Sequence, residues 1–95
     1  PSGQSRRSAM KRVIFDQGAF EDFTDWATRD KKIYQRIVTL ITDVLRQPYQ
    51  GLGKPEPLKH ELQGYWSRRI TEEHRLVYTM EGDALVIIAC RYHYA

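Results

Sequence analysis

Apolar side chains recur at helical spacing over the first half of the chain. The spacing predicts a first helix over roughly Gly18–Arg29 and a second, more strongly amphipathic helix that begins at Lys31. Asp16 and Asp30 precede these segments, and a short polar side chain at that position is typical of a helix N-cap. Pro48 has no backbone N–H and restricts the residue before it, so the second helix must end before this proline.

Strands are predicted on both sides of the helical pair. Lys11–Phe15 is short and β-rich, and residues 48–64 are dense in Gly and Pro, which predicts a loop with room for a short strand around Leu58–His60. Apolar and polar side chains then alternate, and a last strand is expected from Ala84 to about Tyr92. The predicted fold is α+β, with two helices on one face of a small, mostly antiparallel, twisted sheet whose other face is open to solvent.

The composition describes one small domain held together by its own core. The chain has 95 residues, of which 41% are hydrophobic, and no apolar run reaches the ~18 residues of a membrane span. The single cysteine, Cys90, cannot form an internal disulfide and lies in the most apolar predicted strand, where a buried thiol is favoured over a reactive thiolate. We therefore expect a cytoplasmic protein that makes no contact with a membrane.

The net charge says little about the ligand. The chain carries 15 Lys and Arg against 12 Asp and Glu, but Arg6 and Arg7 lie in Pro1–Ala9, a polar stretch without hydrophobic period. Met10 follows this stretch, so we expect Pro1–Ala9 to be an expression remnant or a non-native extension and residues 10–95 to form a single domain. Without the two arginines the balance is 15 − 2 = 13 basic against 12 acidic residues. An anion-binding site must therefore come from local clustering of cations.

Cationic and proton-transfer side chains are crowded between Lys54 and Tyr94, namely Lys54, Glu56, Lys59, His60, Arg68, Arg69, His74, Arg75, Arg91 and His93. The histidines have no metal-ligand spacing and no glycine-rich phosphate loop is present, so we expect no cofactor. Arg68 and Arg69 are neighbours on a strand and point to opposite faces, so one can lie on the open face and the other is solvated or ion-paired. Glu56, between two prolines, is either a surface carboxylate or a base held in one direction.

The runs GKPEPLKHEL (53–62), GYWSRRITEEHRLVY (64–78) and ACRYHY (89–94) carry a resemblance. They resemble the YoeB/Txe family of bacterial toxins, within the RelE-like superfamily, and the similarity spans Met10–Tyr94. The resemblance implies the RelE-like β-α-α-β-β-β(-β) fold. It also implies an mRNA interferase, an endoribonuclease that cleaves mRNA in the A site of the 70S ribosome and inhibits translation. A YefM-type antitoxin would neutralise it, operator DNA would be bound only through the antitoxin complex, and homodimers are known in the family.

The family's functional positions match this sequence residue by residue. The resemblance assigns catalytic functions to Glu56, Arg75 and His93, and contacts with the transition state or the RNA to Lys59, Arg69 and Tyr94. It implies a metal-independent reaction in which a ribose 2′-OH attacks the adjacent phosphate and expels the 5′-oxygen. In that reaction Glu56 is the expected base, His93 the expected acid, and the cations stabilise the charged phosphorane.

Readings from other classes stay open at this point. The same basic, aromatic-rich sheet suits a non-catalytic RNA- or ribosome-binding module, or an inactivated toxin that acts as a transcriptional corepressor with its antitoxin. A metal nuclease, in contrast, would be inhibited by EDTA. The chain also departs from the family pattern, because Ala95 follows Tyr94, where the family typically ends.

Overall fold

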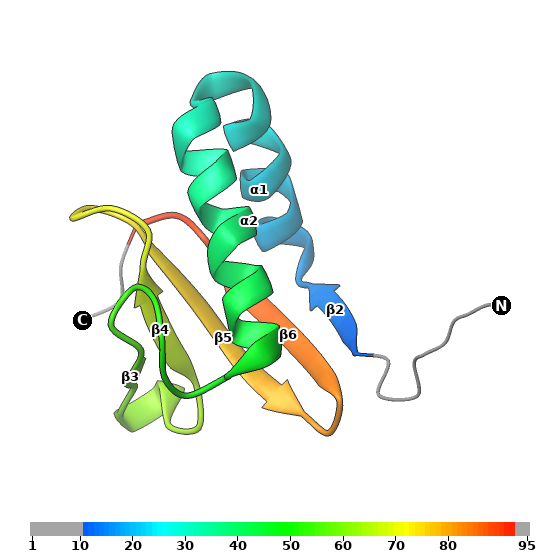
Figure 1. Cartoon of the computed structure of the whole chain (residues 1–95), viewed down its shortest axis with the longest axis vertical. Helices are drawn as coiled ribbons and strands as arrows, with labels where there is room; N and C mark the ends of the chain where they lie inside the picture. Colours follow the sequence, from blue (N-terminus) through cyan, green and yellow to red (C-terminus); the bar gives the residue numbers. More distant parts are fainter. Residues whose placement is uncertain (1–10, 93–95) are drawn as a thin grey trace, which may run out of the picture.

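Two paired helices lie on one face of a five-stranded sheet in the computed structural model, which describes residues 11–92 (Figure 1). The elements in chain order are β2 (Arg12–Phe15), α1 (Gln17–Arg29), α2 (Lys31–Arg46), β3 (Glu56–Pro57), the short 3-10 helix η1 (His60–Leu62), β4 (Trp66–Arg69), β5 (Arg75–Glu81) and β6 (Ala84–Ala89). The strand order is β2-β6-β5-β4-β3, with β2 parallel to β6 and the other pairs antiparallel. The α+β prediction is confirmed.

Local signals explain where the helices begin and end. The Asp30 carboxylate accepts the backbone N–H groups of Lys32 (3.1 Å) and Ile33 (3.3 Å), which fixes the start of α2. Asp16 occupies the N-cap position of α1 but makes no side-chain cap hydrogen bond. The second helix ends at Arg46, two residues before Pro48, as predicted. No helix within residues 11–92 has the length and apolar character needed to cross a membrane.

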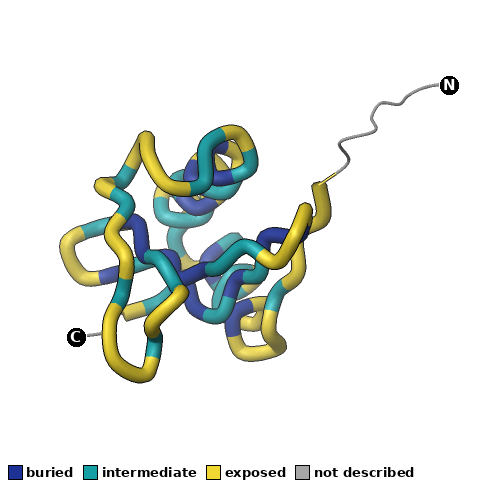
Figure 2. Tube along the Cα trace, turned by 90° about the horizontal axis from the view of Figure 1, so that it is seen from below, coloured by how far each residue is buried: buried dark blue, intermediate teal, exposed yellow. Residues whose placement is uncertain are grey.

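The hydrophobic core lies between the helices and the sheet face that they cover. Its buried members are Ala19, Trp26, Ile37, Leu40, Val44, Ile70, Leu76, Tyr78, Leu85, Ile87 and Cys90. Figure 2 shows buried segments across the middle of the molecule and exposed residues mainly in the outer loops. Burial raises the pKa of the Cys90 thiol to about 12, so this cysteine is a protonated core residue, as the sequence predicts.

Two predicted strands have different bounds in the structure. The short strand expected around Leu58–His60 is instead Glu56–Pro57, and His60 begins η1 with a left-handed φ of +60° that an extended strand cannot accommodate. The last strand ends at Ala89 and does not reach Tyr92, which also has a φ of +60°. At Tyr92, hydrogen bonds with His74 and Arg75 hold the backbone, and the local pattern of apolar residues does not reveal these distant contacts.

A buried arginine connects the loop after α2 to the core. The Arg68 side chain is completely buried and forms a 2.6 Å ion pair with Asp43 of α2. Its five N–H groups donate to the Asp43 carboxylate, the Tyr78 hydroxyl and the backbone carbonyls of Gln47, Gln50 and Leu52. We call this set of residues the Arg68 network. It satisfies every donor of a buried guanidinium, so the loop at residues 47–52 has one preferred path.

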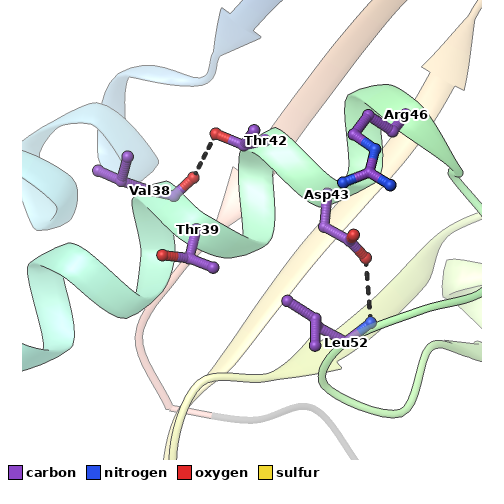
Figure 3. A pocket seen from close by; sticks show the side chains of 6 residues that line it. All are labelled: Val38, Thr39, Thr42, Asp43, Arg46 and Leu52. Atoms are coloured by element: carbon purple, nitrogen blue, oxygen red, sulfur yellow. Dashed lines mark hydrogen bonds between the residues drawn. The ribbon is translucent and has the colours of Figure 1, made fainter.

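Asp43 completes the Arg68 network from the helix side. Its carboxylate faces the backbone N–H of Leu52 at 3.0 Å (Figure 3) and accepts a 3.3 Å hydrogen bond from Gln47. The hydrogen bond from Leu52, followed by the one from Arg68, lowers the Asp43 pKa to about 2. The ionised carboxylate is therefore the stable form at neutral pH.

The low pKa of Asp43 predicts acid sensitivity of the fold. A carboxyl group with a folded pKa below its unfolded value adds stability above the unfolded pKa, and this stability is lost as the pH falls through the folded pKa. The free energy of unfolding should therefore decrease as the pH falls from 3.8, the ordinary pKa of an aspartate, to about 2, the pKa of Asp43 in the folded protein. Urea titrations across this interval should show a weaker pH dependence for Asp43→Asn, although that variant starts from lower stability. An equal pH dependence in both proteins contradicts the prediction.

A candidate active site on the open face of the sheet

Strand register places three of the predicted site residues on the sheet face opposite the helices. Arg69 of β4 pairs directly with Arg75 of β5, and Glu56 of β3 pairs with Ser67 of β4. Directly paired residues of antiparallel strands point to the same face, and neighbours along a strand alternate. Because Arg68 is buried on the helix side, Arg69 points to the open face. The structure therefore decides which of the two adjacent arginines belongs to the core.

The two arginines on the open face form an unfavourable pair in the absence of a ligand. Like charges directly opposite each other in a sheet destabilise it. Within residues 11–92, neither Arg69 nor Arg75 has an acidic side chain within ion-pairing distance. An oxyanion between the two guanidinium groups would relieve this repulsion and accept hydrogen bonds from both, which makes this position a candidate phosphate site.

The Arg75 side chain is held in place by the turn that precedes β5. Its Nη1 group donates to the carbonyl oxygens of Thr71 (2.5 Å), Glu72 (3.1 Å) and His74 (3.1 Å). Among the described residues, its Nη2 and Nε groups have no protein acceptor within hydrogen-bonding distance. One nitrogen of the guanidinium thus fixes its orientation, and the other two have N–H groups available for an anion.

Glu56 is exposed in the edge strand β3, and Lys59 is exposed just before η1. The segment that carries them is joined to β4, since the Arg69 N–H donates to the Gly53 carbonyl at 2.6 Å. Gly53 has a φ of +77°, and an added Cβ atom would lie 3.0 Å from Leu40, so glycine suits this close approach. No ion pair joins Glu56 to a cation within residues 11–92. Its carboxylate oxygens therefore remain accessible on the open face.

The remaining predicted site residues, His93 and Tyr94, lie outside the described residues. The residue just before them, Tyr92, does contact the site: its carbonyl accepts a hydrogen bond from the N–H of Arg75 at 2.8 Å. The structure thus brings together Glu56, Arg69 and Arg75 on one face, with Lys59 on the adjoining loop. Within residues 11–92 no group of three His, Cys, Asp or Glu side chains is arranged to hold a metal ion.

Sequence reasoning missed the residues that support this face from behind. The second arginine was expected to be solvated or ion-paired; it is buried and ion-paired, with Asp43, a partner 25 positions away that the sequence did not identify. A signal was available, since Asp43 lies next to the buried Val44 within the apolar stripe of α2. A carboxylate on the core side of an amphipathic helix requires a buried cation or several hydrogen-bond donors.

The fold and this face define the class of the protein, a small α+β domain whose uncovered sheet surface carries a carboxylate beside opposed arginines. A family profile described as "YoeB-like toxin of bacterial type II toxin-antitoxin system" matches residues 15–94. The YoeB toxin of Escherichia coli K12 is 54% identical over 83 residues, which cover 87% of this chain and 99% of the relative. The chain therefore belongs to the YoeB-like toxins, as its motifs predicted.

Solved structures agree with this assignment. The YoeB–YefM complex from Staphylococcus aureus contains a chain that superposes with a TM-score of 0.83 at 42% identity, covering 90% of this chain and 99% of that one. The YoeB dimer from the same organism gives a TM-score of 0.83 at 44% identity and covers 88% of this chain and 98% of that one. The RelE-like fold expected from the resemblance is thereby confirmed.

Proposed function

We propose that this protein is a ribosome-dependent mRNA endonuclease. It cleaves mRNA in the ribosomal A site by metal-independent attack of a ribose 2′-OH on the adjacent phosphodiester, and so inhibits translation in the cytoplasm. The observation that carries the proposal is the direct pairing of Arg69 with Arg75 on the open face, with Glu56 on the neighbouring edge strand of the same sheet. Membership of the YoeB-like toxins supports the same function.

The reaction uses only side chains of this protein. The Glu56 carboxylate takes the proton of the 2′-OH, the 2′-oxygen bonds to phosphorus, and the P–O5′ bond breaks. His93 donates a proton to the departing 5′-oxygen, so the products are a 2′,3′-cyclic phosphate and a 5′-hydroxyl. Arg69 and Arg75 bind the non-bridging oxygens, where negative charge increases in the phosphorane, and preorganised donors at such a position are an effective source of catalysis.

Two further residues complete the proposed site. Lys59 contributes a point charge from the loop after β3, and Tyr94 orients a catalytic group or stacks on a base of the RNA. General acid–base catalysis supplies ~10²–10⁴-fold per group, so electrostatic stabilisation and substrate positioning must provide much of the acceleration. The ribosome holds the mRNA in the required in-line geometry. Free RNA is cleaved slowly because nothing holds it in that geometry.

The proposed partners follow from the relatives. A YefM-type antitoxin neutralises the protein, as the YoeB–YefM complex from Staphylococcus aureus suggests, and operator DNA is bound only through that complex. A homodimer is the proposed assembly of the free toxin, by analogy with the YoeB dimer. Residues 10–95 form the toxin domain in this proposal, which involves no membrane and no cofactor.

Primer extension on mRNA in translating ribosomes tests the proposed function. The wild-type protein should produce a stop within the codon in the A site, and His93→Ala should remove it. Naked RNA should be cut much more slowly than ribosome-bound mRNA. Equal cleavage of the two substrates overturns the ribosome dependence. Growth arrest that survives both Glu56→Ala and His93→Ala indicates a non-catalytic ribosome-binding protein or a corepressor.

A further inference from the structure

The backbone of Tyr92 is held on both sides by two consecutive residues. The Tyr92 N–H donates to Nδ1 of His74 at 2.8 Å, and the Tyr92 carbonyl accepts the N–H of Arg75 at 2.8 Å. Tyr92 has a left-handed φ of +60°, which is disfavoured for a residue other than glycine. Surrounding contacts must maintain this conformation, and these two hydrogen bonds supply them.

The His74 ring is itself fixed by aromatic neighbours. It is 7% exposed and lies between Trp26 of α1, with ring centroids 4.9 Å apart, and Tyr92, with centroids 5.5 Å apart. Trp26 also holds the chain directly, since its Nε1–H donates to the Cys90 carbonyl at 3.1 Å. We call His74, Trp26 and the Arg75 N–H the C-terminal clamp. It binds the backbone at Cys90 and Tyr92, just after β6 has ended.

Charged groups reinforce the same segment from α1. The Arg91 guanidinium lies 3.5 Å from the Asp22 carboxylate and 3.6 Å from that of Asp25. It also lies 5.3 Å from the centre of the Trp26 ring and 5.4 Å from that of Tyr92. The path of the chain up to Tyr92 is therefore fixed by side chains of α1 and by the turn before β5.

One turn controls two parts of the proposed site. The carbonyls of Thr71, Glu72 and His74 orient the Arg75 guanidinium, and the His74 ring from the same turn holds the residue immediately before His93. A histidine with only a packing function could be replaced by an apolar residue of similar size. Such a residue would lack the ring nitrogen Nδ1, which accepts a hydrogen bond from the N–H of the strained Tyr92 backbone.

We propose that His74 is a positioning residue for the reaction: it fixes the backbone of Tyr92, the residue immediately before the proposed general acid His93. This inference rests on the proposed function. The neutral imidazole acts with Nδ1 as the acceptor and with its proton on Nε2, which lies 3.7 Å from the Glu73 carboxylate. A small error in the placement of the acid is costly, because misplacement by ~1 Å can reduce a rate about 10²-fold.

Two substitutions separate packing from the hydrogen bond. His74→Phe keeps an aromatic ring beside Trp26 but leaves the Tyr92 N–H without its acceptor. His74→Asn places an amide oxygen close to the position of Nδ1. We expect His74→Phe to lower kcat for cleavage of ribosome-bound mRNA ~10–10²-fold with little change in KM, and His74→Asn to restore most of the loss. A change in KM alone, or equal losses in the two variants, overturns the proposal.

Double variants identify the group through which His74 acts. In a His93→Ala background, His74→Phe should cause no further loss, because the acid that it positions is absent. In a Glu56→Gln background the two losses should multiply, since Glu56 is held by a different strand. If His93→Ala has no effect by itself, the proposed function fails. If His93→Ala reduces cleavage and His74→Phe does not, only the positioning inference fails.

Nuclear magnetic resonance tests the clamp without any substitution. In the wild-type protein, the nitrogen spectrum of the His74 ring should show Nδ1 without a proton, and the Tyr92 amide should be protected from hydrogen exchange. A proton on Nδ1 or an unprotected Tyr92 amide overturns the proposal, even if His74→Phe does not fold.

Discussion

Replacing Arg68 by methionine should lower the free energy of unfolding by about 3–5 kcal/mol, as expected when one partner of a buried ion pair is removed. The substitution leaves the Asp43 carboxylate without its cation and the Tyr78 hydroxyl without a donor. It also removes the donors to three carbonyl groups of the loop at residues 47–52. Urea denaturation at neutral pH, monitored by the fluorescence of the two tryptophans, measures the effect.

The adjacent arginine supplies a matched control. Arg69→Met removes the same charge from the next position of β4, but its side chain is exposed, and surface substitutions usually change stability within about 0.5 kcal/mol. The double variant Arg68→Met, Asp43→Leu should recover part of the lost stability, because neither charge then remains buried alone. If Arg68→Met and Arg69→Met unfold at the same urea concentration, the Arg68 network does not contribute to stability as its contacts indicate.

The helical half of the fold could be predicted because its signals are local. The apolar stripe of α2, the Asp30 cap and the stop before Pro48 each depend on residues within a few positions of one another. The bounds of β3 and the end of β6 could not be predicted in this way. His60 and Tyr92 take left-handed conformations there, and Tyr92 depends on His74, 18 positions away.

The candidate site, like the fold, could be predicted where local patterns decide and not where distant contacts decide. Alternation along a strand correctly placed Arg68 and Arg69 on opposite faces, but it could not decide which one is buried. That choice depends on Asp43 and on three carbonyl groups of the loop at residues 47–52, contacts that exist only after the chain has folded. The run WSRR therefore identified Arg68 and Arg69 as candidates, and the tertiary contacts show which of the two is buried.

The Arg68 network also links stability to the proposed chemistry. It fixes the loop that leads into Gly53, whose carbonyl accepts the N–H of Arg69, and Glu56 follows three residues later. On the core side of β4, Arg68 thus fixes the chain that leads to the proposed base. On the open side of the same strand, Arg69 is proposed to bind the phosphate. Because the buried and the exposed arginine are neighbours, the single strand β4 contributes both to the stability of the fold and to the proposed phosphate site.

Replacing Glu56 by glutamine should lower the rate of cleavage of ribosome-bound mRNA by ~10²–10⁴-fold, the range for loss of a general base. The amide keeps the size of the side chain but cannot accept the 2′-OH proton. Stability should stay unchanged, because Glu56 is exposed and has no ion-pair partner within residues 11–92. Single-turnover cleavage, with ribosome binding measured separately, isolates the chemical step.

Glu61 provides the matched control for this prediction. It is an exposed glutamate in η1, five positions from Glu56, so Glu61→Gln makes the same chemical change on the same surface segment. Its cleavage rate should stay close to that of the wild type. A Glu56→Gln rate equal to that of Glu61→Gln contradicts the assignment of the base. Catalysis would then rest on the arginines and the general acid, because their charges stabilise the phosphorane without any proton transfer to a carboxylate.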